Sequence, residues 1–398
     1  MLALDPLLDH VGWASILIVL LKVVIAFAGL MISVMAMVWF ERKIVADMQN
    51  RIGPNLAGPF GILQTLADGI KLFFKEDLIP AKADRFAFVL APFLSLVPAF
   101  LTFVVIPLGG DFSAGHGGVV SIAGHKTLFQ IADPHIGILF VLAMSSMAVY
   151  GVMLAGWSSG SKYPLLGSVR ASAQMVSYEA AMGLALLAVL LESGSLSTNA
   201  IVSGQSVWHW NLWITGGVPF VIFLIAGTAE LNRPPFDLVE AEQELVGGFH
   251  TEYSSIRFAL FFLSEFMNTI TMSAIIVTLF FGGPSGPLAW APNWARGVLP
   301  TIYFFAKLLV FLFTFVWFRG TLPRFRYDQL MDLGWKLLIP LSLGWFLLLV
   351  AFHVAQDQHW NRFVTGIVTV VGLALGGALL SGAMRTSKAR RAAEEVSV

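Results

Sequence analysis

The sequence predicts an all-α polytopic membrane protein, and its composition, the length of its apolar segments and the placement of its charges all indicate this class. Of its 398 residues, 57% are hydrophobic and only 12% are charged, whereas charged residues make up about 25% of ordinary soluble domains. A soluble fold could not bury so much apolar surface. The formal net charge of zero argues against nucleic acid as a partner.

About nine segments are apolar enough to form transmembrane helices, each of which needs about 20 mostly apolar residues. The first segment is too long for the core of a cleaved signal peptide, and Asp5 and Asp9 precede it where Lys or Arg would be expected. The fourth and fifth segments are short. The predicted spans cover roughly residues 13–40, 86–108, 134–157, 173–191, 212–229, 257–282, 298–318, 334–354 and 363–384.

The loops between these spans predict their orientation. Loops that follow odd-numbered spans hold 19 of the 24 Lys and Arg residues, and loops that follow even-numbered spans hold three. Cytoplasmic loops normally carry this excess of positive charge. We therefore expect the N-terminus outside and the C-terminus in the cytoplasm, which requires an odd number of spans.

The chain is interpreted as one membrane domain with two additions. Residues 1–354 form the eight-span domain, residues 355–384 supply a ninth span, and residues 385–398 form a basic cytoplasmic tail. The ninth span carries five glycines and no charge, a composition that suits close helix packing. We expect it to be a packing element.

The first cytoplasmic loop, residues 41–85, combines two Gly-Pro pairs with an amphipathic segment. The Gly-Pro pairs predict tight turns, and apolar residues at helical spacing predict a helix over residues 61–75. This helix is too short to span, so we expect it in the membrane interface. It is either a peripheral anchor on anionic lipid or one wall of a cavity. Asp68 favours the wall, because it lies one turn before Lys71 and the two can neutralise each other.

Residues 230–252 form an acidic loop on the same side of the membrane. A solvated loop is the usual fate of a charge run, but these acids alternate with Leu, Val and Phe and adjoin two spans. Crowded, partly buried carboxylates raise one another's pKa, so that some hold protons near neutral pH, as a proton relay requires. Both interpretations stay open from the pattern alone. The six acids are Glu230, Asp237, Glu240, Glu242, Glu244 and Glu252.

Several charges fall within the spans, where each costs about 2.5–3.5 kcal/mol on insertion scales and is a functional candidate by default. Glu179 and Glu265 are the best candidates for buried proton carriers. Glu192 lies at a span end and is expected to be solvated. Lys22 is ambiguous because its long side chain could snorkel. We expect Lys307, in the middle of a span, to pair with an acid on a neighbouring helix.

The sequence contains no Cys, so it has no thiolate ligands for a disulfide, a metal or an iron–sulfur cluster. A haem-bearing membrane protein would need His pairs within spans, and only His135 and His353 fall in spans, both near an end. His116 and His125, in the glycine-rich outside loop, are expected to be solvated. We therefore predict no metal and no covalently bound cofactor in this chain.

Seven motifs follow one another between residues 41 and 331. They are Glu41-Arg42-Lys43; Gln49-x-Arg51-x-Gly53-Pro54-Asn55-x-x-Gly58-Pro59-x-Gly61; Gln64-x-x-Ala67-Asp68-Gly69-x-Lys71-Leu72; Ser161-Lys162-Tyr163; Ala173-Gln174-x-x-Ser177-Tyr178-Glu179; Ala229-Glu230-x-Asn232-Arg233-x-Pro235-Phe236-Asp237-Leu238; and Arg326-Tyr327-Asp328-Gln329-Leu330-Met331. Together they resemble the H-subunit family of NADH–quinone oxidoreductase, the respiratory complex I family that includes subunit 1 of the mitochondrial enzyme. Eight of the nine spans fit that family's architecture, which commonly stops after the eighth.

The resemblance implies a membrane subunit that carries no redox cofactor, walls a quinone chamber and couples quinone reduction to proton translocation. It implies quinone as substrate, and it places NADH, flavin and the iron–sulfur clusters in partner subunits. The implied partners are the peripheral-arm iron–sulfur and quinone-site subunits, the small and antiporter-like membrane subunits, and the lipid bilayer of a bacterial-type inner (plasma) membrane. Carried over by motif, the quinone-binding residues are Arg42, Gln49, Arg51, Asp68, Lys71, Arg233, Phe236 and Arg326. The proton-path residues are Glu179, Glu230, Asp237, Glu240, Glu242, Glu244, Glu252 and Glu265.

Two other functions remain as alternatives. The first is the related membrane subunit of an energy-converting hydrogenase-type complex, which has the fold without quinone chemistry. The intact Gly-Pro pattern of the first loop and its Asp68–Lys71 pair favour the quinone enzyme. The second is a stand-alone proton-coupled transporter. That class predicts inverted repeats, which the sequence does not contain.

Overall fold

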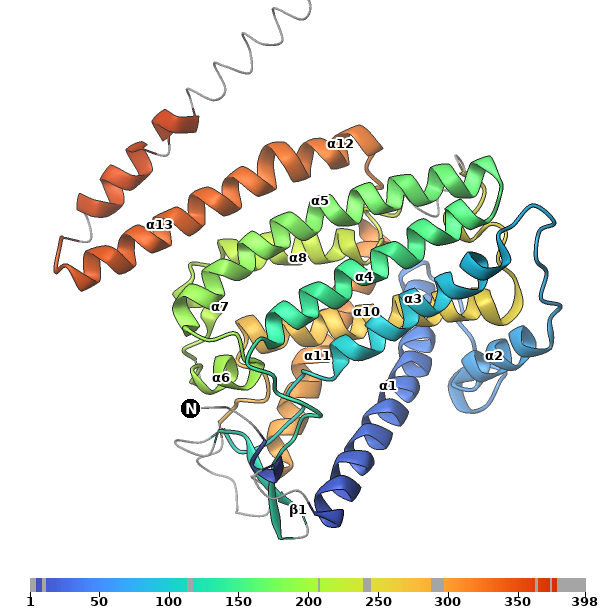
Figure 1. Ribbon diagram of the computed structural model, residues 1–398, viewed down its shortest axis with the longest axis horizontal. Coiled ribbons are helices and arrows are strands. Elements are labelled where there is room, and N and C mark those ends of the chain that lie inside the picture. Colours follow the sequence, from blue (N-terminus) through green and yellow to red (C-terminus); the bar gives the residue numbers. More distant parts are fainter. Residues whose placement is uncertain are drawn as a thin grey trace, which may run out of the picture.

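The computed structural model describes residues 5–8, 12–112, 117–122, 124–206, 208–238, 245–287, 297–361, 364–372 and 374–377. In these ranges almost all regular structure is helical (Figure 1). The long helices are α1 (Trp13–Met48), α3 (Arg85–Phe103), α4 (Gly137–Ser158), α5 (Lys162–Ser193), α10 (Ser255–Phe280), α11 (Leu299–Thr321) and α13 (Ile339–Asp357). The shorter ones are α2 (Gln64–Phe74), α6 (Thr198–Ser203), α7 (Asn211–Ile214), α8 (Val218–Glu230) and α12 (Tyr327–Asp332).

Within the described ranges, seven helices are long and apolar enough to cross a membrane, with α12, a π-helical turn over Leu333–Leu338 and α13 forming one of them. The prediction of an all-α polytopic membrane protein is therefore confirmed. The fifth predicted span, 212–229, is wrong as one continuous helix. Gly216 and Gly217, both with positive φ, separate α7 from an α8 of only 13 residues.

The described part of the ninth predicted span forms a shorter apolar helix over Val364–Gly377. The rest of that span and the basic tail lie outside the described residues. The total number of spans, their orientation and the domain limits at residues 354 and 384 stay predictions.

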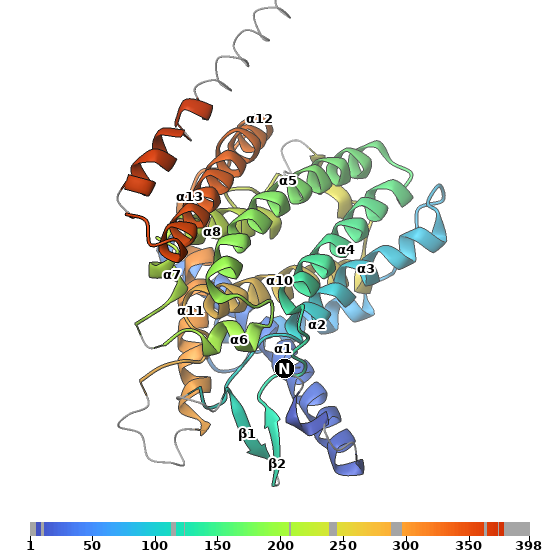
Figure 2. The same ribbon diagram turned by 60° about the vertical axis from the view of Figure 1, so that its left-hand side comes forward.

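Helices α3, α4 and α5 lie side by side in both ribbon views (Figures 1 and 2). Asp84 caps the start of α3 by accepting hydrogen bonds from two backbone N–H groups of its first turn. A Cβ atom on Gly151 would lie 2.4 Å from the Ser95 Oγ, and one on Gly156 would lie 2.2 Å from the Ser168 Oγ. These glycines therefore let α4 approach both of its neighbours closely, as small residues do between membrane helices.

Helix α10 is the most enclosed of the long helices, and α1, α3, α8 and α11 all contact it. From Phe266 to Phe280 every residue except Asn268 is buried. Dispersion contacts between packed side chains hold such a core together, because lipid tails are as apolar as the side chains themselves. The core thus fixes the positions of the helices that carry the charged residues.

The amphipathic helix predicted over residues 61–75 is confirmed as α2, which begins at Gln64 and contacts α1 and α10. A short 3₁₀ turn, Pro59–Gly61, precedes it. Gly61 has φ +78°, and a Cβ atom there would lie 2.3 Å from the carbonyl oxygen of Pro54. Only glycine fits this turn, which brings α2 back against the end of α1.

Part of the loop that we predict to lie outside, expected only as a glycine-rich segment, forms a hairpin. Strands β1 (Val119–Ile122) and β2 (His125–Leu128) pair antiparallel, with Val119 opposite Leu128. Figure 2 shows the hairpin projecting from the end of the bundle at which α1 begins. His125 is exposed, as expected. His116 lies outside the described residues.

Candidate functional site

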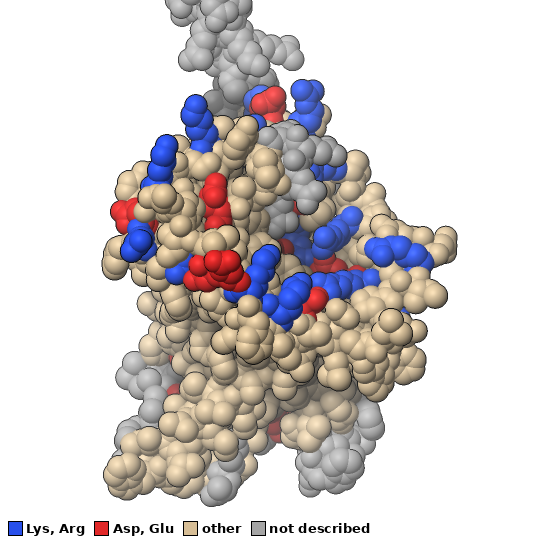
Figure 3. Space-filling view, turned by 90° about the vertical axis from the view of Figure 1, so that its right-hand side faces the viewer, with Lys and Arg blue, Asp and Glu red and all other residues tan. Residues whose placement is uncertain are grey.

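A cleft of about 830 Å³ opens where α1 ends. The last turns of α1, the segment 51–56, the start of α2 and Arg319 of α11 surround it. Figure 3 views the molecule from the side on which α2 lies in Figure 1, and shows Lys and Arg side chains intermixed with Asp and Glu above a broad uncharged region. The residues that line the cleft are Glu41, Arg42, Val45, Arg51, Ile52, Gly53, Pro54, Asn55, Leu56, Gln64 and Arg319.

Asp68 ties α2 to the end of α1 beside this cleft. Its carboxylate lies 2.6 Å from Nη1 of Arg42 and 3.8 Å from Nζ of Lys71, and it accepts a hydrogen bond of 3.4 Å from Gln64. The predicted pairing of Asp68 with Lys71 is confirmed, although Arg42 is the closer partner. The Arg42 side chain is 43% exposed, so the pair contributes at most about 1 kcal/mol to stability. Its effect is to orient the two side chains.

The turn after α1 places a second arginine in the cleft. Arg51 donates a hydrogen bond of 2.7 Å from Nε to Oε1 of Gln49. Asn50, between them, has φ +53°, a left-handed conformation that Asn tolerates better than most residues. Arg42, Gln49, Arg51, Asp68 and Lys71, all predicted from the first loop, thus lie in or beside one cleft.

A buried cluster of charges lies beneath the cleft. Arg233 donates from Nη1 to Oε2 of Glu41 at 2.5 Å, and its Nε lies 3.2 Å from Oε1 of Glu265. The guanidinium carbon also lies 4.4 Å from the ring centroid of Phe266, an attractive cation–π distance. Arg319 of α11 contacts the other oxygen of Glu41. Glu41 and Arg233 are only 3% and 2% exposed.

Two members of this cluster, Arg233 and Glu265, were predicted site residues, and the structure brings them together. Glu41 and Arg319 were missed as site residues. The sequence held one signal for Glu41, which is its position directly after a long apolar segment. Its partner Arg233 also stands out, as the one cation in the predicted acidic loop. Only the tertiary fold shows that these two groups meet.

Two predicted acids point at neighbouring serines of α4. Ser145 donates a hydrogen bond to Glu230, at the end of α8, and Ser146 donates one to Glu179 of α5. Two consecutive residues of one helix therefore each bind one of the two carboxylates. Hydroxyl groups can both donate and accept hydrogen bonds, so they can connect two carboxylates in a polar chain.

Two small cavities, of about 50 and 60 Å³, meet at Glu230 and Asn268. Glu265 lines the second of them. Among the residues that the structure describes, three buried oxygens that line these cavities have no hydrogen-bond partner: Ser95 Oγ, Thr271 Oγ1 and Glu230 Oε2. Buried polar atoms normally have partners, and each cavity is large and polar enough to hold water. The cavities can therefore carry protons between carboxylates that do not touch.

Comparison with known proteins assigns the chain to a family. A family model described as NADH dehydrogenase matches residues 21–350. The H subunit of NADH-quinone oxidoreductase from Frankia alni is 52% identical over 380 residues, which is 94% of this chain and 82% of that protein. The chain belongs to the family of NADH-quinone oxidoreductase H subunits. The H subunits of Frankia casuarinae and Streptomyces avermitilis are 50% and 49% identical, over 99% and 86% of this chain and 86% and 75% of their own lengths.

The family model ends at residue 350, close to the end of α13. The alignment with the Frankia casuarinae protein covers 99% of this chain, so it continues through the segment that follows. A continuation after α13 is therefore shared with at least one other member of the family. Every site residue predicted above lies inside the part that the family model matches.

Phe236 and Arg326 lie apart from the residues that line the cleft. Phe236 is 4% exposed and packs between Tyr178 and Phe325, with ring centroids 5.4 and 5.5 Å away. Arg326 is exposed and directly precedes α12, where its backbone N–H donates a hydrogen bond of 3.2 Å to Oε1 of Gln329. Their assignment as quinone-binding residues stays a prediction.

Of the remaining acids, Asp237 pairs with Arg324 at 2.9 Å, and Glu252 is half-buried. Glu240, Glu242 and Glu244 lie outside the described residues, so their place in the proton path also stays a prediction. Among the residues that the structure describes, no group of three or more His, Asp or Glu is arranged to hold a metal ion.

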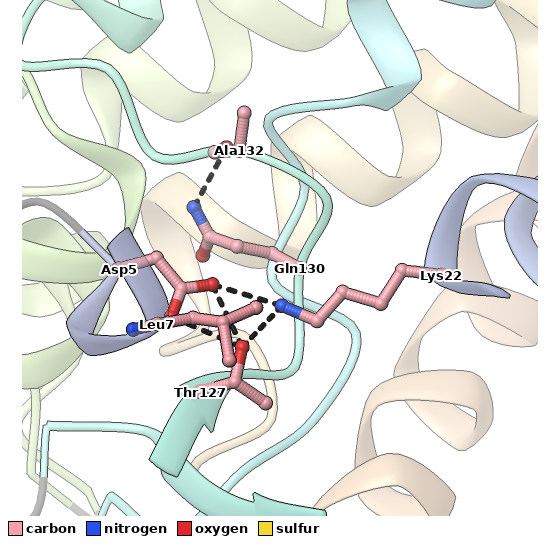
Figure 4. A network of polar contacts seen from close by, with 6 residues as sticks. All are labelled: Asp5, Leu7, Lys22, Thr127, Gln130 and Ala132. Carbon is pink, nitrogen blue, oxygen red and sulfur yellow. Dashed lines mark hydrogen bonds and ion pairs between the residues drawn. The ribbon is translucent and has the colours of Figure 1, made fainter. Parts of the chain in front are cut away.

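The charges near the start of α1 are held differently. Figure 4 shows Lys22 reaching between Asp5 and Thr127, and its Nζ lies 2.9 Å from Oδ2 of Asp5. Thr127 in turn donates to the same carboxylate at 2.8 Å. Lys22 thus binds the hairpin and the N-terminal segment and does not snorkel.

Lys307 and Glu192 complete the set of in-span charges. The expectation that Lys307 pairs with an acid is wrong. Its Nζ donates hydrogen bonds of 2.7, 2.9 and 2.8 Å to the carbonyl oxygens of Phe281, Gly283 and Ser285. Three carbonyl dipoles at the turn after α10 satisfy the ammonium group as a carboxylate would. Glu192 is partly exposed and lies 3.0 Å from Nε2 of His353.

Proposed function

We propose that this chain is the membrane subunit of a proton-pumping NADH–quinone oxidoreductase in a bacterial-type inner membrane. Within it, residues 1–354 would form the quinone chamber and the proton path, and the segment beyond would be a packing addition. One observation carries the proposal. Glu41 lines the cleft, Glu265 lines the inner cavity, and Arg233 forms ion pairs with both.

The cleft suits the polar head of a quinone. Arg42 and Arg51 supply N–H donors for the two carbonyl oxygens, and their positive charge stabilises the negative charge that reduction creates. The exposed apolar residues of α2 would border the route by which an apolar tail reaches the lipid. Electrons would come from iron–sulfur clusters in peripheral-arm partner subunits, with NADH and flavin further from the membrane, because this chain has no cysteine ligands.

Charge created in the cleft can act on the acids through the buried cluster. Arg233 is shared between Glu41 and Glu265, so a change of charge beside Glu41 alters how strongly Arg233 holds Glu265. Glu265 then exchanges protons with Glu230 through the cavity, and Ser145 and Ser146 extend the chain to Glu179. Antiporter-like subunits of the same complex would receive this signal.

The quinone side of the proposal is tested with Asp68→Ala. We expect quinone reduction to slow about 10-fold or more, because Asp68 orients Arg42 and misplaced groups around a reacting centre cost rate. Reduction of an artificial acceptor by the peripheral arm should stay normal, since that route bypasses the cleft. Asp332→Ala, which removes an exposed acid paired with Lys336, is the matched control. An equal loss of both activities in an assembled complex would remove the cleft from quinone chemistry.

The coupling side is tested with Glu230→Gln, which keeps the size of the side chain and removes its titration. Membrane-potential formation and quinone reduction should both fall about 10-fold or more, because a positioned acid–base group contributes about 10²–10⁴-fold to proton transfer. Glu192→Gln, at the partly exposed pair with His353, should leave both rates unchanged. Normal potential and normal rate with Glu230→Gln would reject the proton path.

A further inference from the structure

Helix α10 carries a polar residue, Asn268, midway along its length. Its neighbours Met267 and Thr269 have no exposed surface, whereas Asn268 is partly exposed, so water can reach its side chain. A polar side chain in the middle of a membrane span is costly and is a functional candidate by default. The path of acids and serines described above does not include this amide.

The two small cavities meet at Asn268. Among the described residues, the lining that both cavities share contains two polar side chains, those of Asn268 and Glu230. The other shared residues are apolar: Ala148, Met175 and Leu231. Water at the junction of the cavities therefore has an amide from α10 and a carboxyl group from α8 as its side-chain partners.

One face of α10 leads from one cavity to the other. Glu265, Asn268 and Thr271 follow one another at intervals of three residues, which places them along one side of the helix. Glu265 lines only the second cavity, Thr271 lines only the first, and Asn268 lines both. Asn268 is thus the middle member of a row of polar side chains that borders the whole water-accessible space.

The chemistry of an amide suits a place through which protons pass. An amide has two N–H donors and a carbonyl acceptor, so it can hold water molecules on two sides at once. It does not titrate near neutral pH, so it orients water without retaining a proton. Oε2 of Glu230 and Oγ1 of Thr271, which have no hydrogen bond within the described residues, can bind the same water.

We propose that Asn268 is a positioning residue that holds the water through which Glu265 and Glu230 exchange protons. The inference rests on the proton path proposed above and names the group that orders its water. The O–H bond of protonated Glu265 breaks as its proton joins a water molecule held by Asn268. That water then gives a proton to the carboxylate of Glu230 and is restored, and no electrons change hands.

The test compares Asn268→Leu with Asn268→Ala in inverted membrane vesicles that carry the complex, with rates expressed per assembled complex. Leucine keeps the size of the side chain but excludes water, so quinone reduction and membrane-potential formation should fall about 10-fold or more, given the size of acid–base effects. The artificial-acceptor rate should stay normal. Alanine leaves space for water in place of the amide, so its loss should be smaller. A purely structural role predicts the opposite order, because alanine leaves a cavity in the core.

Two further measurements address the water itself. In D₂O, the solvent isotope effect on quinone reduction should be larger for Asn268→Leu than for the wild type, because proton transfer has become the slow step. Asn268→Ser, which keeps a donor and an acceptor, should retain most of the rate. Ser273→Ala is the matched control. It removes a hydroxyl group of the same helix that donates to the Thr269 carbonyl oxygen and lines neither cavity, so its rate and isotope effect should be those of the wild type.

Each other result has a definite meaning. Normal rates with Asn268→Leu, alongside a defect with Glu230→Gln, would overturn the role of Asn268 and leave the proposed function intact. Normal rates with both variants would overturn the proposed function itself. A larger loss with Asn268→Ala than with Asn268→Leu, or a loss without any change in the isotope effect, would make Asn268 a packing residue and would also overturn its role. If Asn268→Leu does not assemble, an unchanged isotope effect in Asn268→Ala would overturn that role and a larger one would support it.

Discussion

Charged side chains near the start of α1 and those near its end are satisfied to different degrees. Near the start, Lys22 is shared by Asp5 and Thr127, and Lys307 has three carbonyl partners. Near the end, Arg233 forms ion pairs with Glu41 and Glu265, but its Nε and Nη2 have no hydrogen bond within the described residues, and neither does Oε2 of Glu230. Within the described residues, two other charged side chains have a buried atom without a hydrogen bond. Asp237 lies shortly after α8, and Arg257 lies in the first turn of α10.

This difference distinguishes charged groups with a structural role from those that can exchange protons. A buried charged group whose hydrogen-bonding atoms all have partners does not readily exchange protons, because a change in its protonation would break a hydrogen bond. A buried charge with an unused atom beside a cavity can take up water or a proton. Whether an intramembrane charge is a functional candidate therefore depends on its hydrogen-bond partners, and the sequence does not show these partners.

The largest effect should come from Arg233→Met, which leaves Glu41 with less compensation and Glu265 without this partner. Breaking a buried ion pair costs about 3–5 kcal/mol, so the amount of assembled complex should fall sharply. Lys336→Met, at an exposed pair, should change stability by no more than about 0.5 kcal/mol. Complex content in membranes measures both. Full assembly with Arg233→Met would mean that the cluster is not the junction between cleft and cavity.

A smaller effect is expected for Lys307→Met, at the satisfied end. Three carbonyl oxygens lose their donor, and an unsatisfied buried acceptor costs about 1–3 kcal/mol, so the unfolding temperature of the purified complex should fall. The ratio of membrane potential to quinone turnover should stay that of the wild type. A lower ratio at full assembly would place Lys307 in the proton path and break the distinction drawn above.

Much of the fold could be predicted because membrane helices leave a strong pattern. The seven long helices coincide with seven predicted spans, and α2 follows the spacing of its apolar residues. The break between α7 and α8 was missed, because two glycines in a short apolar run do not by themselves show a turn. The hairpin was missed because four-residue strands carry little pattern of their own.

The site could be predicted only as separate pieces. Asp68 and Lys71 are three residues apart, so helical geometry alone brings them together. Glu41 and Arg233 are 192 residues apart, and no local rule connects them. The two small cavities at Glu230 gave no signal, because they depend on how the surrounding helices pack.

The smallest effect concerns Asp133, an acid just before α4 whose two carboxylate oxygens each lie 2.8 Å from the donating Ser197 hydroxyl. Burial raises its pKa above the ordinary value of 3.8, although the Ser197 hydroxyl works against this. The folded state therefore holds a proton there more tightly than the unfolded state, so stability falls as the pH rises from about 3.8 through the raised pKa. Asp133→Asn keeps an oxygen for Ser197 and removes the titration. Its unfolding temperature should exceed that of the wild type slightly at pH 7, and the difference should vanish below pH 4. A difference that persists in acid would show that Asp133 acts through packing and not through its charge.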